Sequence, residues 1–181
     1  MFTQETISLR QIHPEEFEQF FSLMETSFPA DERRTYTEQK AVLNNPRYHI
    51  FVLPDTADNQ IKGFITAWEF EGITYLEHFA VSPAYRNHGL GASIIQEILR
   101  MYSCRICLEV EFPETEFAKR RIGFYKRNGF YLNEYPYEQP AYSKEKNPVP
   151  LLIMTSGGEI SEKEFEKIKK EIYKEVFSIE M

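Results

Sequence analysis

The sequence predicts a single α/β domain built on a mixed, mostly antiparallel twisted sheet of about seven strands flanked by helices. Its 181 residues suit one domain with a sizeable core. A β-prone segment ending at Ser82 runs through a glycine-containing loop into helical spacing, marked by Ile94, Ile95 and Ile98. Another β-prone segment follows at 105–111. A strand–helix–strand order implies a parallel pair joined by a right-handed crossover.

The segment before residue 73 is expected to form a strand, two helices and two more strands. Pro14 suits the first position of a helix. Thr35 and Glu38 have the spacing of a capping box for the second, short helix. The turn-rich stretch 54–59 separates the two strand candidates before residue 71, and Glu71-Gly72 forms a tight link to the next strand. These elements cover residues 6–10, 14–28, 35–45, 48–53 and 61–70.

From residue 73 onward, strands and helices are expected to alternate. Gly129 suits the cap after a helix over 115–128, and Gly123 inside that helix predicts close packing against a neighbour. Ser161 and Glu164 form a capping box for a C-terminal amphipathic helix that packs on its own domain or on a partner chain. We therefore divide the chain into a main domain, residues 1–157, and a C-terminal helical segment, residues 158–181. The elements cover residues 73–82, 92–102, 105–111, 115–128, 130–137, 149–155 and 161–179.

Composition excludes several classes of protein. A hydrophobic content of 42% excludes wholesale disorder. A net charge of −7 argues against broad binding to nucleic acid or to anionic membranes. Because no apolar N-terminal signal or membrane-length run is present, the expected location is the cytoplasm. Monomer and homodimer both stay open.

The two cysteines form a C-x-x-C spacing, which can indicate redox chemistry or zinc. Cys104 and Cys107 fall in a β-like run, where residues three apart point to opposite faces. No further cysteine is available to complete a zinc site. The sequence favours buried or half-buried free thiols, and we predict no metal.

The loop between the central strand and its helix has the chemistry of a phosphate site. First-turn N–H groups of a helix lack intrahelical partners, and the helix dipole favours an anion there. Glycines let a ligand approach the backbone, and an arginine adds a permanent charge. An ordinary strand–turn–helix connection is the alternative. The residues concerned are Arg86, Asn87, His88, Gly89, Leu90, Gly91 and Ala92.

Three signatures together resemble the GCN5-related N-acetyltransferases. Arg86-x-x-Gly89-x-Gly91 resembles their acyl-CoA pyrophosphate loop. Leu108-Glu109-Val110, then Tyr125, then Gly129-Phe130 follow in the family's order. The resemblance covers about 76–130 and implies the acyl-CoA N-acyltransferase fold for 1–157. It also implies direct, ternary-complex acetyl transfer from acetyl-CoA to a primary amine of a small molecule or peptide. The alternatives are a non-catalytic acyl-CoA-binding or regulatory module and an interaction protein built on the C-terminal helix.

The resemblance also implies residues that hold the coenzyme. The strand before the loop would pair with the pantetheine arm through its main chain, as an added strand does. Many relatives carry an Asn seven residues before the tyrosine, where this chain has Ala118. Lys119, Arg120 and Arg121 could instead bind the 3′-phosphate, or form a solvated face. Besides the loop, the predicted coenzyme residues are Phe79, Ala80, Val81, Arg121 and Phe124.

Acetyl transfer needs an acid for the sulfur and a base for the amine. Tyr125 is the predicted acid, since a phenol keeps its proton at neutral pH, although a packed aromatic is the usual role of a tyrosine. For the base we favour Glu109 and Glu77 over His78 and His49. The resemblance places substrate contacts at 28–36 and 135–142, where aromatic and acidic residues suit a cationic amine. The sequence leaves the acceptor itself undetermined.

Overall fold

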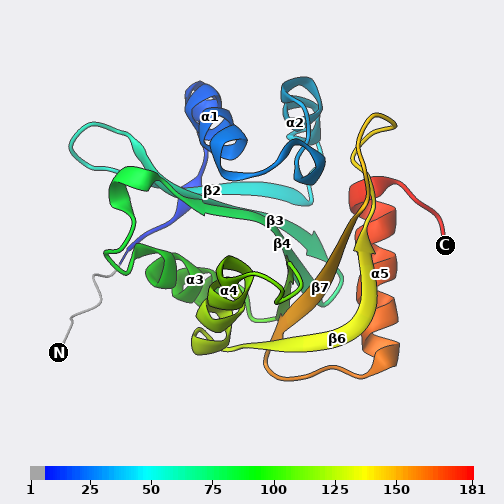
Figure 1. Ribbon diagram of the computed structural model, residues 1–181. Coiled ribbons are helices and arrows are strands. Elements are labelled where there is room, and N and C mark those ends of the chain that lie inside the picture. The colour runs from blue at the N-terminus through cyan, green and yellow to red at the C-terminus, as the bar shows by residue number, and fades with distance from the viewer. Residues whose placement is uncertain (1–6) are drawn as a thin grey trace.

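The computed structural model describes residues 7–181 and contains a seven-stranded sheet in the order β1-β2-β3-β4-β5-β7-β6 (Figure 1). Only β4 and β5 pair in parallel, as predicted from the strand–helix–strand order. The predicted mixed, mostly antiparallel sheet is confirmed. The strands are β1 Arg10–Gln11, β2 Tyr48–Pro54, β3 Ile61–Phe70, β4 Ile73–Val81, β5 Arg105–Val110, β6 Phe130–Gln139 and β7 Val149–Ser156.

The first strand differs from the prediction. It covers Arg10–Gln11, whereas the predicted strand began at Thr6, which lies outside the described residues. Pro14 opens a 3₁₀ turn, and the α-helix itself starts at Phe17. The helices are α1 Phe17–Ser27, α2 Tyr36–Val42, α3 Leu90–Met101, α4 Glu116–Arg127 and α5 Glu162–Phe177.

Two predicted capping boxes define where helices begin. The Thr35 side chain accepts a hydrogen bond from the Glu38 amide, and Glu38 in turn accepts from the Thr35 amide at 2.8 Å. Ser161 and Glu164 make the same reciprocal pair at the start of α5. Each pair satisfies first-turn amides that have no partner inside the helix.

Helices cover both faces of the sheet. Figure 1 shows α1 and α2 together above the sheet and α3 with α4 below it. One core cluster joins α1 and α5 to the sheet through Phe20, Trp68 and Phe165. The other joins α3 and α4 to the opposite face through Ile95 and Phe130. Because side chains alternate along a strand, β4 and β5 offer different residues to each face.

The parallel pair β4–β5 separates part-way along its length. Its last paired residues are Leu76 and Leu108, although the strands continue to Val81 and Val110. A β-bulge explains the divergence, because two residues of β4 oppose the single residue Thr66 of β3. Beyond the bulge, the far end of β4 pairs with β3 only, among the strands of the described chain. One edge of β4 is therefore open.

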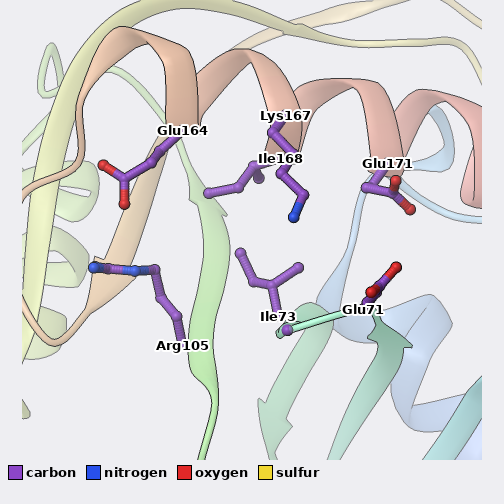
Figure 2. Close-up of a pocket in the computed structure, with 8 residues that line it drawn as sticks. Glu71, Ile73, Arg105, Glu164, Lys167, Ile168 and Glu171 are labelled. Atoms are coloured by element: carbon purple, nitrogen blue, oxygen red, sulfur yellow. The ribbon is translucent and has the colours of Figure 1, made fainter.

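The C-terminal helix packs on the sheet of its own chain. Phe165, Ile168 and Ile172 of α5 are buried, and the Phe165 ring stacks on Tyr135 with centroids 4.9 Å apart. A small pocket of about 150 Å³ lies beneath this helix. In Figure 2, Ile73 and Ile168 face each other across it. No predicted site residue lines it, and we assign it no function.

Two predictions about single residues have different outcomes. A Cβ at Gly123 would meet only the mobile end of Arg127, at 3.3 Å. No backbone or core side chain lies within 4 Å of that position, so the structure shows no close packing of another element against Gly123. Cys107 is buried and Cys104 is half-buried, both as free thiols, and burial raises the pKa of the Cys107 thiol.

Within residues 7–181, no helix is both long and apolar enough to cross a membrane. The same part of the chain contains no group of three or more His, Cys, Asp or Glu side chains that could hold a metal ion.

Candidate active site

The turn between β4 and α3 exposes the start of a helix. Pro83–Tyr85 forms a 3₁₀ turn, and Arg86 Nε donates a hydrogen bond to the Val81 carbonyl at 2.9 Å, which folds the turn back on the strand. Asn87 and Gly89 have positive φ angles of 67° and 76°. Gly89 is the N-cap of α3 and provides no side chain to cap it. The first amides of α3 are therefore available to an anion.

A groove of about 890 Å³ runs from this turn between α3 and α4 to the open edge of β4. All predicted coenzyme residues except His88 line it, and so does Tyr125. Arg120, a candidate for the 3′-phosphate, and Phe28, from the segment 28–36 predicted to contact the substrate, also line it. The remaining lining residues are not among the predicted site residues: Thr26, Ser27, Tyr85, Phe117, Arg127 and Asn128. The two from the end of α1 reach the groove only through the tertiary fold. Arg120 carried a signal, since it belongs to the basic run on α4.

The middle of the groove is narrow and aromatic. Phe79 of β4 stacks on Phe124 of α4 with ring centroids 6.3 Å apart. A Cβ on Gly91 would touch both rings, at 3.6 Å and 3.5 Å. The absence of a side chain at Gly91 therefore keeps open the space between the α3 terminus and these rings.

The basic run of α4 is divided between groove and solvent. Arg120 and Arg121 line the groove, and the Arg121 guanidinium lies 4.8 Å from the Phe117 ring centre. Lys119 is not part of the lining, and its ammonium pairs with Glu116 at 2.9 Å. Ala118 is buried. Two cations of the run are therefore available to a ligand in the groove.

Tyr125 lies on the buried side of α4 and is 7% exposed. Its ring packs edge-on against Phe124 and Phe130, with centroids 5.2 Å and 5.7 Å away. Burial raises the pKa of Tyr125 to about 12, while Arg121 lowers it slightly. The phenol is therefore protonated across the physiological range, as a general acid must be.

Glu77 lies on the opposite face of the sheet and is surrounded by donors. Its side chain is 1% exposed and pairs with the Arg34 guanidinium at 2.8 Å. Trp68 Nε1 donates to it at 2.9 Å, and the Tyr142 hydroxyl donates at 2.7 Å. Burial alone would raise the pKa of Glu77, but Arg34 and these donors lower it to about 2. A carboxylate held in this way is a weak proton acceptor, so the geometry argues against Glu77 as the base.

We expect Glu77→Gln to lower the free energy of unfolding by about 3 kcal/mol at pH 7, because it leaves the Arg34 charge buried without its partner. The native pKa lies below the ordinary 4.5, so the stabilisation is complete above that value and is lost as pH falls toward 2. Urea unfolding at pH 7 and pH 3 would measure the difference, with exposed Glu162→Gln as the control. Equal stability of the Glu77 variant and the wild type at pH 7 would contradict the buried ion pair.

Glu109 faces the same side of the sheet as Glu77, from the neighbouring strand β5. The Tyr137 hydroxyl donates a hydrogen bond to its carboxylate. Burial raises the pKa of Glu109 to about 7, the hydrogen bond opposes that rise, and the Glu77 charge adds to it. Glu109 therefore gains and loses its proton near neutral pH, which is the property of an effective general base.

Neither histidine shares these properties. His78 is buried beside Glu77, its Nε2 lies 2.8 Å from the Glu32 carbonyl, and burial lowers its pKa. Because a carbonyl oxygen only accepts, Nε2 is the protonated nitrogen and serves as the donor. His49 lies on β2, with Nε2 3.5 Å from Glu69. Like Glu77 and Glu109, neither histidine lines the groove.

Comparison with known proteins shows to which family the chain belongs. The model of the acetyltransferase (GNAT) family matches residues 8–130. This chain belongs to the GNAT acetyltransferase family. It is therefore an acyltransferase, and the resemblance drawn from three short signatures is confirmed. No sequence among the curated proteins matches it significantly.

Solved structures agree with this GNAT assignment. A GNAT-family acetyltransferase from Bacteroides thetaiotaomicron is 32% identical, with a TM-score of 0.86 over 96% of this chain and 100% of that one. The ribosomal-protein-S18-alanine N-acetyltransferase of Escherichia coli is 17% identical, with a TM-score of 0.61 over 86% and 96%. NAA60 of Arabidopsis thaliana, solved with a bisubstrate analogue, is 19% identical, with a TM-score of 0.62 over 83% and 98%. The last two show the shared fold alone.

Within this GNAT domain, the candidate acid and base stand on opposite faces of the sheet. Tyr125 belongs to the core on the α3–α4 side. Glu109 bonds to Tyr137, which belongs to the core on the α1–α5 side. Between these two sides, β4 and β5 are no longer paired beyond Leu76 and Leu108.

Proposed function

We propose that this GNAT enzyme transfers the acetyl group of acetyl-CoA to a primary amine of a small molecule or peptide, directly within a ternary complex. The observation that carries the proposal is the groove between α3 and α4. It joins an uncapped helix start beside Arg86 to the open edge of β4 and contains Tyr125. Its volume of about 890 Å³ is in the range of small-molecule and cofactor sites.

The residues of the groove fit the parts of acetyl-CoA. The amides at the start of α3 and the Arg86 guanidinium would bind the diphosphate. Arg120 and Arg121 offer charge for the 3′-phosphate. The free main-chain edge of 79–81 would pair with the amide groups of the pantetheine arm, as an added strand pairs with a sheet edge. A protein of net charge −7 needs such a local concentration of cations to bind a polyanion.

The two candidate side chains supply the proton transfers. Glu109 would accept a proton from the amine, whose nitrogen forms a bond to the acetyl carbonyl carbon. A main-chain N–H at the open edge of β4 would donate to the carbonyl oxygen as negative charge develops there. Tyr125 would give its proton to the sulfur as the carbon–sulfur bond breaks, so that the products are an acetamide and the free thiol of CoA.

A screen for thiol release tests the proposal. The protein would be incubated with acetyl-CoA and a panel of polyamines, amino acids, aminoglycosides and peptides with free N-termini. We expect at least one amine to raise the rate of thiol release well above the rate of acetyl-CoA hydrolysis. The mass of that amine should increase by roughly 42 units, because an acetyl group replaces a proton. Coenzyme binding without release for any amine would favour a non-catalytic module.

The phosphate contact gives a separate prediction. Arg86→Gln should weaken acetyl-CoA binding about tenfold, because it removes a charge-assisted contact to the diphosphate. Calorimetry at low and high salt would show that the loss shrinks as salt screens the charge. Arg100→Gln is the matched control, since Arg100 lies at the far end of α3 and pairs with Glu97 at 2.6 Å. Equal affinities in the wild type and the Arg86 variant would remove Arg86 from the site.

We also propose that the reaction takes place in the cytoplasm, on the sequence-based grounds given above. Whether the enzyme acts as a monomer or a homodimer stays a prediction.

A further inference from the structure

The bulge in β4 gives two neighbouring residues an unusual position. Glu77 and His78 together oppose Thr66 of β3, where a regular strand would place one residue. The His78 amide bonds to the Thr66 hydroxyl at 2.9 Å, which satisfies the donor that the bulge takes out of the ladder. Both side chains then contact segments that lie on the α1–α2 side of the sheet.

The first segment is the connection between α1 and α2, residues 28–35, which we name the first loop. Arg34 of this loop pairs with Glu77 at 2.8 Å. The Glu32 carbonyl accepts from His78 Nε2 at 2.8 Å. The Phe28 ring packs edge-on against the His78 ring, with centroids 4.8 Å apart. The bulge therefore holds this loop at its start, middle and end.

The second segment is the connection between β6 and β7, residues 140–148, which we name the second loop. The Tyr142 hydroxyl donates to Glu77 at 2.7 Å, and its ring lies 4.8 Å from the Arg34 guanidinium. Farther out, the amide nitrogen of Asn147 bonds to Asp31 at 3.1 Å. The two loops thus contact each other, and both contact the same carboxylate.

Two features indicate that the contacts of this cluster are costly to break. Arg34 and His78 are 6% and 3% exposed, and the Glu77 side chain is 1% exposed, so each contact is shielded from water. The Arg34 guanidinium also lies within 6 Å of both the Trp68 and Tyr48 rings, at 5.7 Å and 5.8 Å. Hydrogen bonds and ion pairs in such surroundings are costly to break, because the freed groups remain unsolvated.

From this geometry we infer that Glu77 and His78 are positioning residues, which clamp the first and second loops around the site where the acceptor amine meets Glu109. The inference rests on the proposed function, and it gives Glu77 a role other than that of the base. Both loops lie on the face that Glu109 shares. A clamp that shapes the amine site should alter amine recognition. It should leave unchanged the part of the groove that α3 and α4 form on the other face, although Phe28 of the first loop also lines the groove.

Tyr142→Phe tests the clamp with little risk to folding, because it keeps the ring and removes one hydrogen bond. Hydrogen exchange without any substrate should accelerate about fivefold in both loops and stay unchanged in α3 and α4. In the acetylation assay, the KM for the amine should rise about fivefold, with the KM for acetyl-CoA and the pH profile unchanged. Tyr131→Phe, on the exposed face of β6, is the matched control and should behave as the wild type.

A second pair of variants tests the histidine. His78→Gln keeps a donor for the Glu32 carbonyl and should retain most of the protection of the first loop. His78→Leu removes the donor and should lose about fivefold in protection. Equal exchange of the two loops in wild type, Tyr142→Phe and His78→Leu would overturn the clamp.

The assay separates this inference from the proposed function. If no amine is acetylated but the loops loosen as expected, the clamp stands and the proposed function fails. If the wild type acetylates an amine and Tyr142→Phe has the same amine KM and exchange, the clamp fails alone. Loss of the pH dependence in Glu77→Gln, with retention in Glu109→Gln, would also overturn it, since Glu77 would then be the base.

Discussion

Replacing Tyr125 with Phe is expected to lower kcat by roughly 10²-fold, with the KM for acetyl-CoA changed by less than about twofold. The variant keeps the ring that packs against Phe124 and Phe130 and removes only the proton that would be given to the departing sulfur. Because the pKa of Tyr125 is raised to about 12, the wild type should keep this acid across pH 6 to 9. Steady-state kinetics of thiol release would measure the effect.

The control for this variant is Tyr102→Phe, which removes a tyrosine hydroxyl outside the groove, one that donates to Glu69 at 2.9 Å. Tyr102 lies at the end of α3 and is not part of the groove lining. An unchanged kcat for the Tyr125 variant would assign that ring to packing, and an increased KM for acetyl-CoA with unchanged kcat would assign it to binding.

The second large effect is expected for Glu109→Gln, which should lower kcat/KM at pH 8 by roughly 10²-fold or more. The base must be ionised to accept a proton, so wild-type kcat/KM should rise with pH and level off above about 7, the pKa of Glu109. The variant should be nearly independent of pH in that window. A pH–rate profile from pH 5.5 to 9 would measure both, with exposed Glu134→Gln as the control.

The same variant should be more stable than the wild type at alkaline pH. The native pKa of Glu109, about 7, lies above the ordinary 4.5, so the folded protein binds this proton more tightly than the unfolded chain does. Stability therefore falls as pH rises from 4.5 to 7, and the loss is complete above 7. Glutamine avoids this loss, so the variant should gain about 3 kcal/mol of stability at pH 8 and none near pH 4. An inactive variant with no gain in stability would mean that Glu109 is not a buried base.

Much of the coenzyme side was readable from local sequence. Gly89, Gly91 and Arg86 lie within six residues, and each has a local reason to be there: a left-handed cap, a position where a Cβ would lie against two aromatic rings, and a hydrogen bond to the preceding strand. Tyr125 came into the prediction through the family resemblance, by its spacing to Gly129 and Phe130. Only His88, which is not part of the groove lining, was included by adjacency alone.

The residues around the acceptor amine could not be predicted from local sequence in the same way. Whether a strand carboxylate is a base depends on its partners, and those of Glu77 are Arg34 and Tyr142, 43 and 65 residues away in the chain. The two carboxylates have similar local sequence, yet one has a pKa of about 2 and the other about 7. Only the tertiary fold brings a guanidinium to one and not to the other.

The bulge in β4 also could not be predicted from the sequence pattern. Its cause is the pairing of two residues with Thr66, which depends on the register between β3 and β4. A single sequence gives the alternation of a strand but not the position at which the register changes. The open edge of β4, on which the coenzyme site depends, therefore came into the prediction only through the family resemblance.

A crystal structure of the enzyme with acetyl-CoA is the most direct test. We expect the diphosphate against the amides of 89–92 beside Arg86, the pantetheine arm along 79–81, and the sulfur within hydrogen-bond reach of the Tyr125 hydroxyl. Crystals that take up the coenzyme elsewhere, or whose groove stays empty at millimolar coenzyme, would contradict the account.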